Sequence, residues 1–223
     1  MCYSPEADVI AGLVVGTIGI DAMRHVDDRR YLALASVPLV LATHQLIEAV
    51  AWWGLRGQVP AEAGEFAAAT YLVIALGVVP FLVPFAVIRA EPNPTRRQWM
   101  APFVVMGGMV AVVMLSSLGT NGYTVAIGGR YLAYEVAISN GGIFTAFYFA
   151  AVGAPLLLSS HRKLVLFGAV NVPVFLGLTL LLSQGLISLW CVWAAISSLV
   201  VARLIRDTGA ERERANRGVV HAR

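Results

Sequence analysis

The sequence predicts an all-α integral membrane protein: a bundle of seven transmembrane helices with the N-terminus outside the cell and the C-terminus in the cytoplasm. Of its 223 residues, 58% are hydrophobic and only 13% are charged, whereas a soluble domain carries about 25% charged residues. Several apolar runs reach the roughly 20 residues that a helix needs to cross the hydrocarbon core. Nearly all of the basic residues fall in every second connection between these runs, and therefore on one side of the bundle, which indicates a fixed orientation.

The first helix begins with recognisable start signals. Ser4 is a suitable N-cap and Pro5 a suitable first-turn residue, and the acidic Glu6 and Asp8 match the positive end of the helix dipole. The predicted transmembrane helices cover residues 4–24, 31–55, 65–88, 99–118, 141–158, 164–183 and 186–205.

The segment between the fourth and fifth helices has no long apolar run. Residues 123–136 are predicted to form a short extracytoplasmic β-hairpin, because the pair Gly128-Gly129 separates two β-prone runs. The helices and the hairpin form one predicted domain, residues 1–206. Residues 207–223 alternate in charge without an apolar period, so we expect a charged cytoplasmic tail.

The basic residues give the orientation. Fourteen of the sixteen Lys and Arg residues fall on one side of the predicted bundle, and only Arg56 and Arg130 fall on the other. The positive-inside rule places the fourteen in the cytoplasm. We therefore expect a multi-pass protein of the inner (plasma) membrane. Its partner is the lipid bilayer and not nucleic acid, because the arginines lie at the ends of apolar runs rather than in a basic domain.

Ionisable residues inside the second helix are the strongest sign of a functional site. His44 and Glu48 are four residues apart and therefore share a face, which Trp52 continues. An ionisable residue within a membrane helix is a functional-site hypothesis by default. Two interpretations remain open at this point: a buried structural pair, in which Glu48 accepts a hydrogen bond from His44, and a chemically active site.

The predicted topology brings the start of the chain towards this pair. Cys2 and Glu6 lie at the outer end of the first helix, beside the outer half of the second. Thiolate sulfur, imidazole nitrogen and carboxylate oxygen together suit zinc or copper. Cys2, His44 and Glu48 are the candidate metal ligands. Glu6 and Glu48 are the candidate catalytic residues, with Glu6 as general base on a metal-bound water.

Two short segments carry a resemblance to a known family. They are Met1-Cys2-Tyr3-Ser4 and His44-Gln45-Leu46-Ile47-Glu48, the latter followed by Trp52. The chain resembles an uncharacterised family of bacterial polytopic membrane proteins that begin Met-Cys-Phe-Ser and carry His-Gln-x-x-Glu near a tryptophan. The resemblance covers the first two helices and implies a site there, but no particular reaction.

Three functions are compatible with this sequence. The first is a metal-binding membrane protein that hydrolyses a lipid or a small amphiphile at the outer ends of the first two helices. The second is a proton-coupled transporter or sensor of a small solute, with His44 and Glu48 as a protonation switch. The third is a non-catalytic subunit of a larger membrane complex. The sequence does not decide whether the protein is an enzyme.

Overall fold

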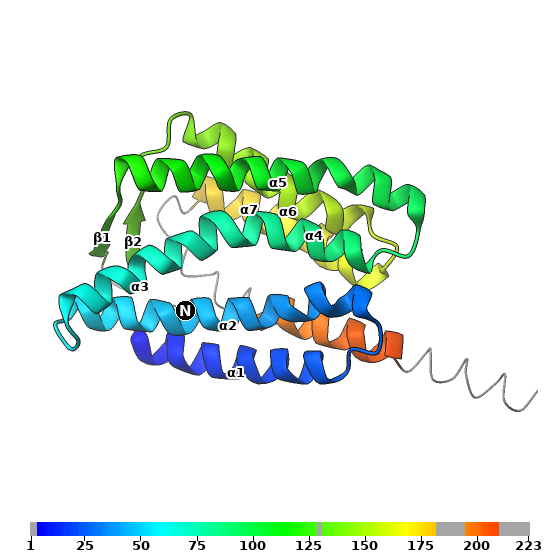
Figure 1. Ribbon diagram of the computed structural model, residues 1–223, viewed down its shortest axis with the longest axis horizontal. Coiled ribbons are helices and arrows are strands. Elements are labelled where there is room, and N and C mark those ends of the chain that lie inside the picture. Colours follow the sequence, from blue (N-terminus) through cyan, green and yellow to red (C-terminus); the bar gives the residue numbers. More distant parts are fainter. Residues whose placement is uncertain (1–3, 129–130, 182–194, 210–223) are drawn as a thin grey trace, which may run out of the picture.

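The computed structural model of the chain describes residues 4–128, 131–181 and 195–209. Long helices lie roughly side by side, and two short strands lie at one end (Figure 1). The helices are α1 Pro5–Arg24, α2 Leu32–Leu55, α3 Ala61–Val73, α4 Val79–Ala90, α5 Pro94–Asn121, α6 Gly141–Leu158 and α7 Arg162–Leu181, and residues 195–209 are also helical. A predominantly helical chain, as predicted, is confirmed.

Four helical stretches among the described residues are long and apolar enough to cross a bilayer. They are Arg29–Leu55, Ala61–Ala90, Pro94–Asn121 and Gly141–Leu158. Every 18-residue stretch of α1 holds three charged residues, so α1 falls outside this set. The predicted helix 164–183 corresponds to α7. The predicted helix 186–205 begins in residues outside the described ranges, and so does the tail beyond residue 209.

Two helices are longer than the sequence pattern indicates. Asn93 caps α5 through side-chain hydrogen bonds from the N–H groups of Thr95 (2.9 Å) and Arg96 (3.2 Å). This cap starts α5 five residues before the predicted helix 99–118. The five-residue π-helical segment η2, Ile74–Val78, joins α3 to α4 into one continuous helix and lies just before Pro80, which cannot donate a backbone hydrogen bond.

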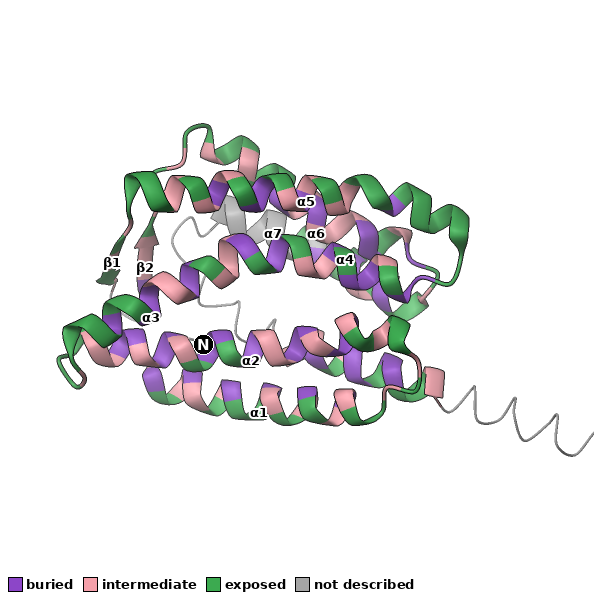
Figure 2. Ribbon diagram, in the orientation of Figure 1, coloured by how far each residue is buried: buried purple, intermediate pink, exposed green. Residues whose placement is uncertain are grey.

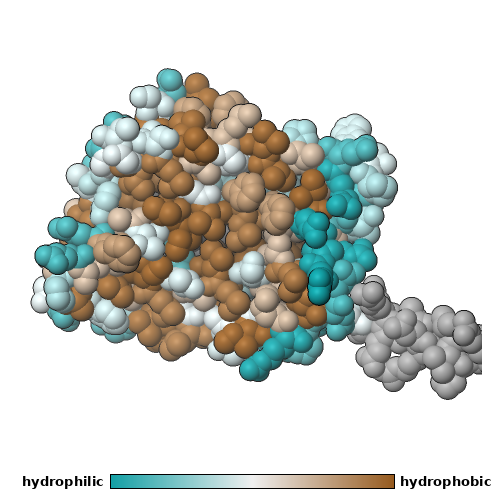
Figure 3. All heavy atoms as spheres, viewed as in Figure 1, coloured by the Kyte–Doolittle hydropathy of each residue, from teal (hydrophilic) through white to brown (hydrophobic). Residues whose placement is uncertain are grey.

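The two ends of the bundle differ from its apolar sides. Much of α5 is exposed, and its exposed positions include Val105, Met109 and Val112 (Figure 2). Hydrophilic residues gather at one end, where α1, α4 and α6 finish and α5 and α7 begin (Figure 3). We call this the arginine end, after Arg24 and Arg97 among others, and the opposite end, with the two strands, the hairpin end.

Small residues bring α1 close to α2. The buried residues of α1 recur every three or four positions, and among them are Gly12, Val15, Gly19 and Ala22. A Cβ atom on Gly12 would lie 2.8 Å from the Leu46 side chain, and one on Gly19 would lie 2.7 Å from that of Leu39. The two helices therefore pack as close antiparallel neighbours, which the absence of glycine side chains permits.

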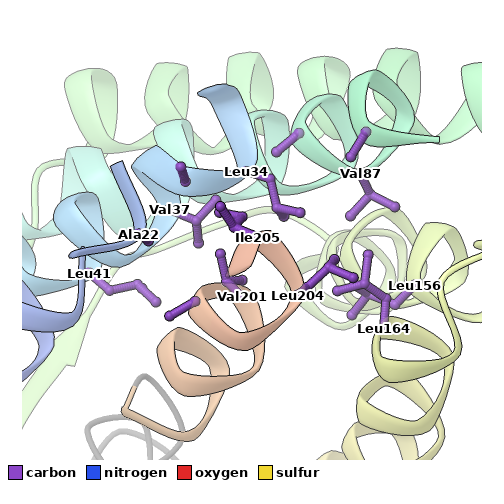
Figure 4. Packing of buried hydrophobic residues seen from close by; sticks show 14 of the residues in the cluster. Ala22, Leu34, Val37, Leu41, Val87, Leu156, Leu164, Val201, Leu204 and Ile205 are labelled. Atoms are coloured by element: carbon purple, nitrogen blue, oxygen red, sulfur yellow. The ribbon is translucent and has the colours of Figure 1, made fainter. Parts of the chain in front are cut away.

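The apolar core lies towards the arginine end. Buried side chains of α2 and of the helix 195–209 meet there, between α1 on one side and α6 and α7 on the other (Figure 4). Leu34, Val201 and Ile205 are almost fully buried in this cluster. Residues 195–209 are thus an integral part of the bundle.

The hairpin predicted between the fourth and fifth helices is confirmed. Strands β1, Thr124–Ile127, and β2, Leu132–Glu135, pair antiparallel with Ile127 opposite Leu132. Leu132 is fully buried and packs with Trp52 of α2 and Ala68 of α3. The hairpin therefore covers the ends of α2 and α3.

Glu91 lies in the connection between α4 and α5 and forms hydrogen bonds with the connection between α6 and α7 at the arginine end. Its carboxylate accepts hydrogen bonds from the Asn93 N–H (3.0 Å), from the Ser159 hydroxyl (3.2 Å), and from both the N–H (2.7 Å) and the hydroxyl of Ser160. Burial by itself raises the pKa of this carboxyl, but the hydrogen bonds outweigh burial and hold the pKa below its ordinary value.

The Glu91 contacts predict an acid-dependent contribution to stability. Because the pKa is lowered in the folded state, the ionised carboxylate stabilises the fold above the ordinary pKa and loses this effect as the pH falls through the lowered one. Glu91→Gln should lower the free energy of unfolding by about 1–3 kcal/mol at pH 7. Denaturant titrations in detergent should show this difference shrinking below about pH 4.5. A difference that stays constant down to pH 3 would contradict the assignment.

The contact between α2 and α3 predicts a strict size limit. A Cβ atom on Gly54 would lie 2.4 Å from the Cα atom of Gly64, so the two backbones touch. Gly64→Ala should lower the free energy of unfolding by about 1–3 kcal/mol, because the new methyl group would meet backbone atoms of α2, which can move aside only if the whole helix shifts. Gly153→Ala on α6 is the matched control, because its Cβ would meet nothing within 4 Å. Equal thermal midpoints for the two variants would show that the contact is not tight.

Candidate functional site

One face of α2 carries a row of buried polar side chains near the hairpin end. His44, Gln45, Glu48 and Trp52 are each at most 1% exposed. Neither ring nitrogen of His44 and neither carboxyl oxygen of Glu48 has a hydrogen-bond partner among the described residues. The predicted pairing on one face is confirmed, but the hydrogen bond from His44 to Glu48, which a purely structural pair would make, is not present.

Helix α1 adds a second carboxyl group to this row. Asp8 is fully buried, and its carboxyl lies close enough to that of Glu48 for the two to interact electrostatically. The indole of Trp52 faces Asp8, although without a hydrogen bond of good geometry. Asp8 reaches this place because it continues the buried face of α1 one turn beyond Gly12.

Aromatic rings from three elements form a column beside the carboxyl groups. The His44 ring stacks on Tyr71 of α3, with 3.9 Å between centroids and 20° between planes. Tyr71 in turn stacks on Tyr134 of β2 at 4.6 Å and 11°. The column therefore links the buried face of α2 directly to the hairpin. We refer to Asp8, His44, Gln45, Glu48, Trp52, Tyr71 and Tyr134 as the polar cluster.

The hairpin is held over the polar cluster by further contacts. The Tyr123 hydroxyl, just before β1, donates a hydrogen bond to the Glu65 carbonyl of α3 at 2.8 Å. Arg56, at the end of α2, lies with its guanidinium 4.8 Å from the centre of the Trp52 ring. These contacts seal the hairpin end of the cluster, so its polar atoms are kept from bulk water.

The polar cluster has a distinct chemical capacity. Two carboxyl groups, one imidazole, one indole N–H and the Tyr134 hydroxyl converge where bulk water does not reach. A carboxylate buried away from water is stable only when a proton or a cation neutralises its charge. An apolar cavity of about 580 Å³ lies between α2, α4, α6 and α7, and no residue of the cluster lines it. The chemistry and this cavity are thus separate features.

The structure keeps two of the predicted metal-site residues, His44 and Glu48, together on α2 and places the candidate base Glu6 apart from them. Glu6 is exposed in the first turn of α1, near Ser4 and Arg56, and lies outside the polar cluster. Cys2 falls outside the described residues. No group of three or more His, Cys, Asp or Glu side chains within the described ranges is placed to hold a metal ion. Zinc or copper ligation by Cys2, His44 and Glu48, and the catalytic roles of Glu6 and Glu48, stay predictions.

Sequence reasoning missed three members of the cluster. Asp8 matches the pattern of a first-turn acid, although the spacing from Asp8 to Gly12, Val15 and Gly19 also places it on the small-residue face of α1. Tyr71 and Tyr134 carry no local signal. They reach the cluster through the packing of α3 and of the hairpin against α2, and this packing is not encoded in any short motif.

The fold and the cluster together define a helical protein with four candidate membrane spans and a buried polar site between its first helices. The chain belongs to a family of unknown function (DUF6629), whose family model matches residues 1–217. The resemblance to an uncharacterised family is thereby confirmed and extends over nearly the whole chain. No curated protein and no solved structure matches it.

The aromatic column predicts that Tyr134 anchors the hairpin through its ring. Tyr134→Ala removes the stack on Tyr71 and should lower the free energy of unfolding by about 2–4 kcal/mol. Tyr134→Phe keeps the ring and should cost less than about 1 kcal/mol, because the hydroxyl has no hydrogen-bond partner among the described residues. Thermal unfolding in detergent distinguishes the two. Equal destabilisation by both substitutions would show that the hydroxyl of Tyr134, and not its ring, holds the hairpin in place.

Proposed function

We propose that this protein is a seven-helix, multi-pass membrane protein in which Asp8, His44 and Glu48 form a buried proton-binding site of a small-solute transporter or sensor. One observation carries the proposal. Glu48 and His44 are each 1% exposed, all four of their polar atoms lack hydrogen-bond partners in the described part of the chain, and a second carboxyl group faces them from α1.

The distribution of charge supports the proposed topology. The structure describes eleven Lys and Arg residues, and all of them except Arg56 lie at the arginine end. The positive-inside rule favours an orientation with that end on the cytoplasmic side of the plasma membrane, and hence with the hairpin and the start of α1 outside. In this orientation the polar cluster lies in the outer half of the membrane and is covered on the outer side by the hairpin.

A proton suits the described cluster better than a metal ion does. A proton needs a single acceptor, whereas structural zinc is held by about four donors and catalytic zinc by three protein ligands. Within the described residues no group of three or more such donors is placed to hold a metal ion. Paired carboxyl groups titrate as one unit, and imidazole is the side chain whose charge changes near neutral pH. Uptake or release of a proton would therefore change the charge at the α1–α2 contact.

The proposal predicts a carboxyl group that changes protonation within the membrane. In liposomes, the infrared band of protonated carboxyl groups should change with pH in the wild type. Glu48→Gln should remove about half of this change, because the paired Asp8 supplies the remainder. Glu62→Gln is the matched control, since Glu62 is exposed at the hairpin end.

Two outcomes would contradict the proposal. One is a pH-dependent band that Glu48→Gln leaves intact. The other is stoichiometric zinc or copper in the purified protein that disappears in His44→Ala, which would favour the metal site with Cys2 instead. Elemental analysis of the same preparations distinguishes these results from the expected one.

A further inference from the structure

The arginine end presents a ring of exposed cations. Each of its ten described basic residues is exposed, and together they come from α1, the turn after it, α4, α5, α7 and the helix 195–209. They are Arg24, Arg29, Arg30, Arg89, Arg96, Arg97, Arg162, Lys163, Arg203 and Arg206. This ring is the largest concentration of one charge on the described surface.

Acidic residues neutralise only part of this ring. Three of the cations are in ion pairs: Arg206 with Asp21, Arg30 with Asp28, and Lys163 with Asp207. Glu91 is turned inward and is occupied by the serine and backbone donors described above. Arg96 donates to the Leu158 and Ser159 carbonyls, which are not charged. Six arginines remain with neither an ion pair nor a side-chain hydrogen bond among the described residues, and we call them the unpaired arginines: Arg24, Arg29, Arg89, Arg97, Arg162 and Arg203.

The position of the ring indicates which anions it meets. It borders the apolar sides of the bundle, where Trp99 is 68% exposed two residues after Arg97. Tryptophan concentrates at the boundary between hydrocarbon and headgroups. Hydrophilic residues at this end border the apolar side of the bundle (Figure 3), so we expect the unpaired arginines at the depth of the lipid headgroups once the bundle is inserted in a membrane.

The opposite end has the reverse charge. Glu6, Glu62, Glu65 and Glu135 are exposed there, and Arg56 is its described cation. An anionic surface is consequently attracted to one end of this molecule and repelled from the other.

We propose that the arginine end binds the headgroups of anionic phospholipids in the leaflet that surrounds it. Arg97 at the start of α5 and Arg162 at the start of α7 contribute to this binding, with the lipid phosphates accepting hydrogen bonds from their guanidinium groups. The inference rests on insertion into a membrane, which is part of the proposed function, and not on the proton-binding site.

The test uses the full-length protein in nanodiscs of phosphatidylcholine, with and without phosphatidylglycerol. Phosphatidylglycerol should raise the thermal midpoint of the wild type by several degrees. The double variant Arg97→Gln/Arg162→Gln should lose about a third of this rise, in proportion to two of six unpaired arginines. Arg56→Gln, a matched control at the opposite end, should keep all of it. Salt at about 1 M should reduce the rise, because the screening length falls to about 3 Å.

Three results would overturn the proposal. They are equal midpoints in the two lipid compositions, an equal loss in Arg56→Gln and the double variant, and the same rise on adding inorganic phosphate to nanodiscs of phosphatidylcholine alone. Glu48→Gln should keep the response to phosphatidylglycerol. A failure of the proton-binding site and a failure of the lipid surface are therefore distinguishable in the same set of nanodiscs.

Discussion

The close contact between α1 and α2 is the interaction on which the other features of the site depend. Gly12 and Gly19 leave no side chains between the two backbones, so α1 lies directly against Leu46 and Leu39 of α2. Asp8 lies on the same face of α1, so the packing of α1 against α2 buries its carboxyl group in the apolar interior. Without this packing, Asp8 would be a solvated acid at the start of a helix, and α2 would bury a single carboxyl group rather than one of a pair.

Burial of polar groups in the cluster is then completed from the other side. Tyr71 and Tyr134 cover His44 with a continuous stack of rings, and Leu132 packs the hairpin against Trp52. Ring stacking and apolar burial stabilise this arrangement, while the polar atoms of Glu48 and His44 have no hydrogen-bond partner in the part of the chain that the structure describes. A protein under selection for stability alone would gain from apolar residues at these positions. The burial of these polar atoms, without hydrogen-bond partners among the described residues, is the observation on which the proposed proton-binding site rests.

Much of the fold was predictable from the sequence because its signals are local. Apolar runs indicated most of the helices, the pair Gly128-Gly129 indicated the hairpin turn, and the spacing of His44 and Glu48 indicated one side of the site. The start of α5 was also encoded locally, in the Asn93 cap, but the apolar pattern concealed it. The remaining features required tertiary structure. The stack of Tyr71 on Tyr134 joins residues 63 positions apart, and no short motif records such a contact. The positions of Asp8 inside and Glu6 outside the cluster follow from which face of α1 meets α2.

The central claim is that Asp8 and Glu48 titrate as one unit across the α1–α2 contact. Solid-state NMR of the Glu48 side-chain carboxyl carbon, titrated with pH in bilayers, measures this directly. The account predicts that Asp8→Asn moves the pH at which the Glu48 signal changes, whereas Glu6→Gln leaves it in place. A Glu48 titration that is identical in the wild type and in Asp8→Asn would contradict it.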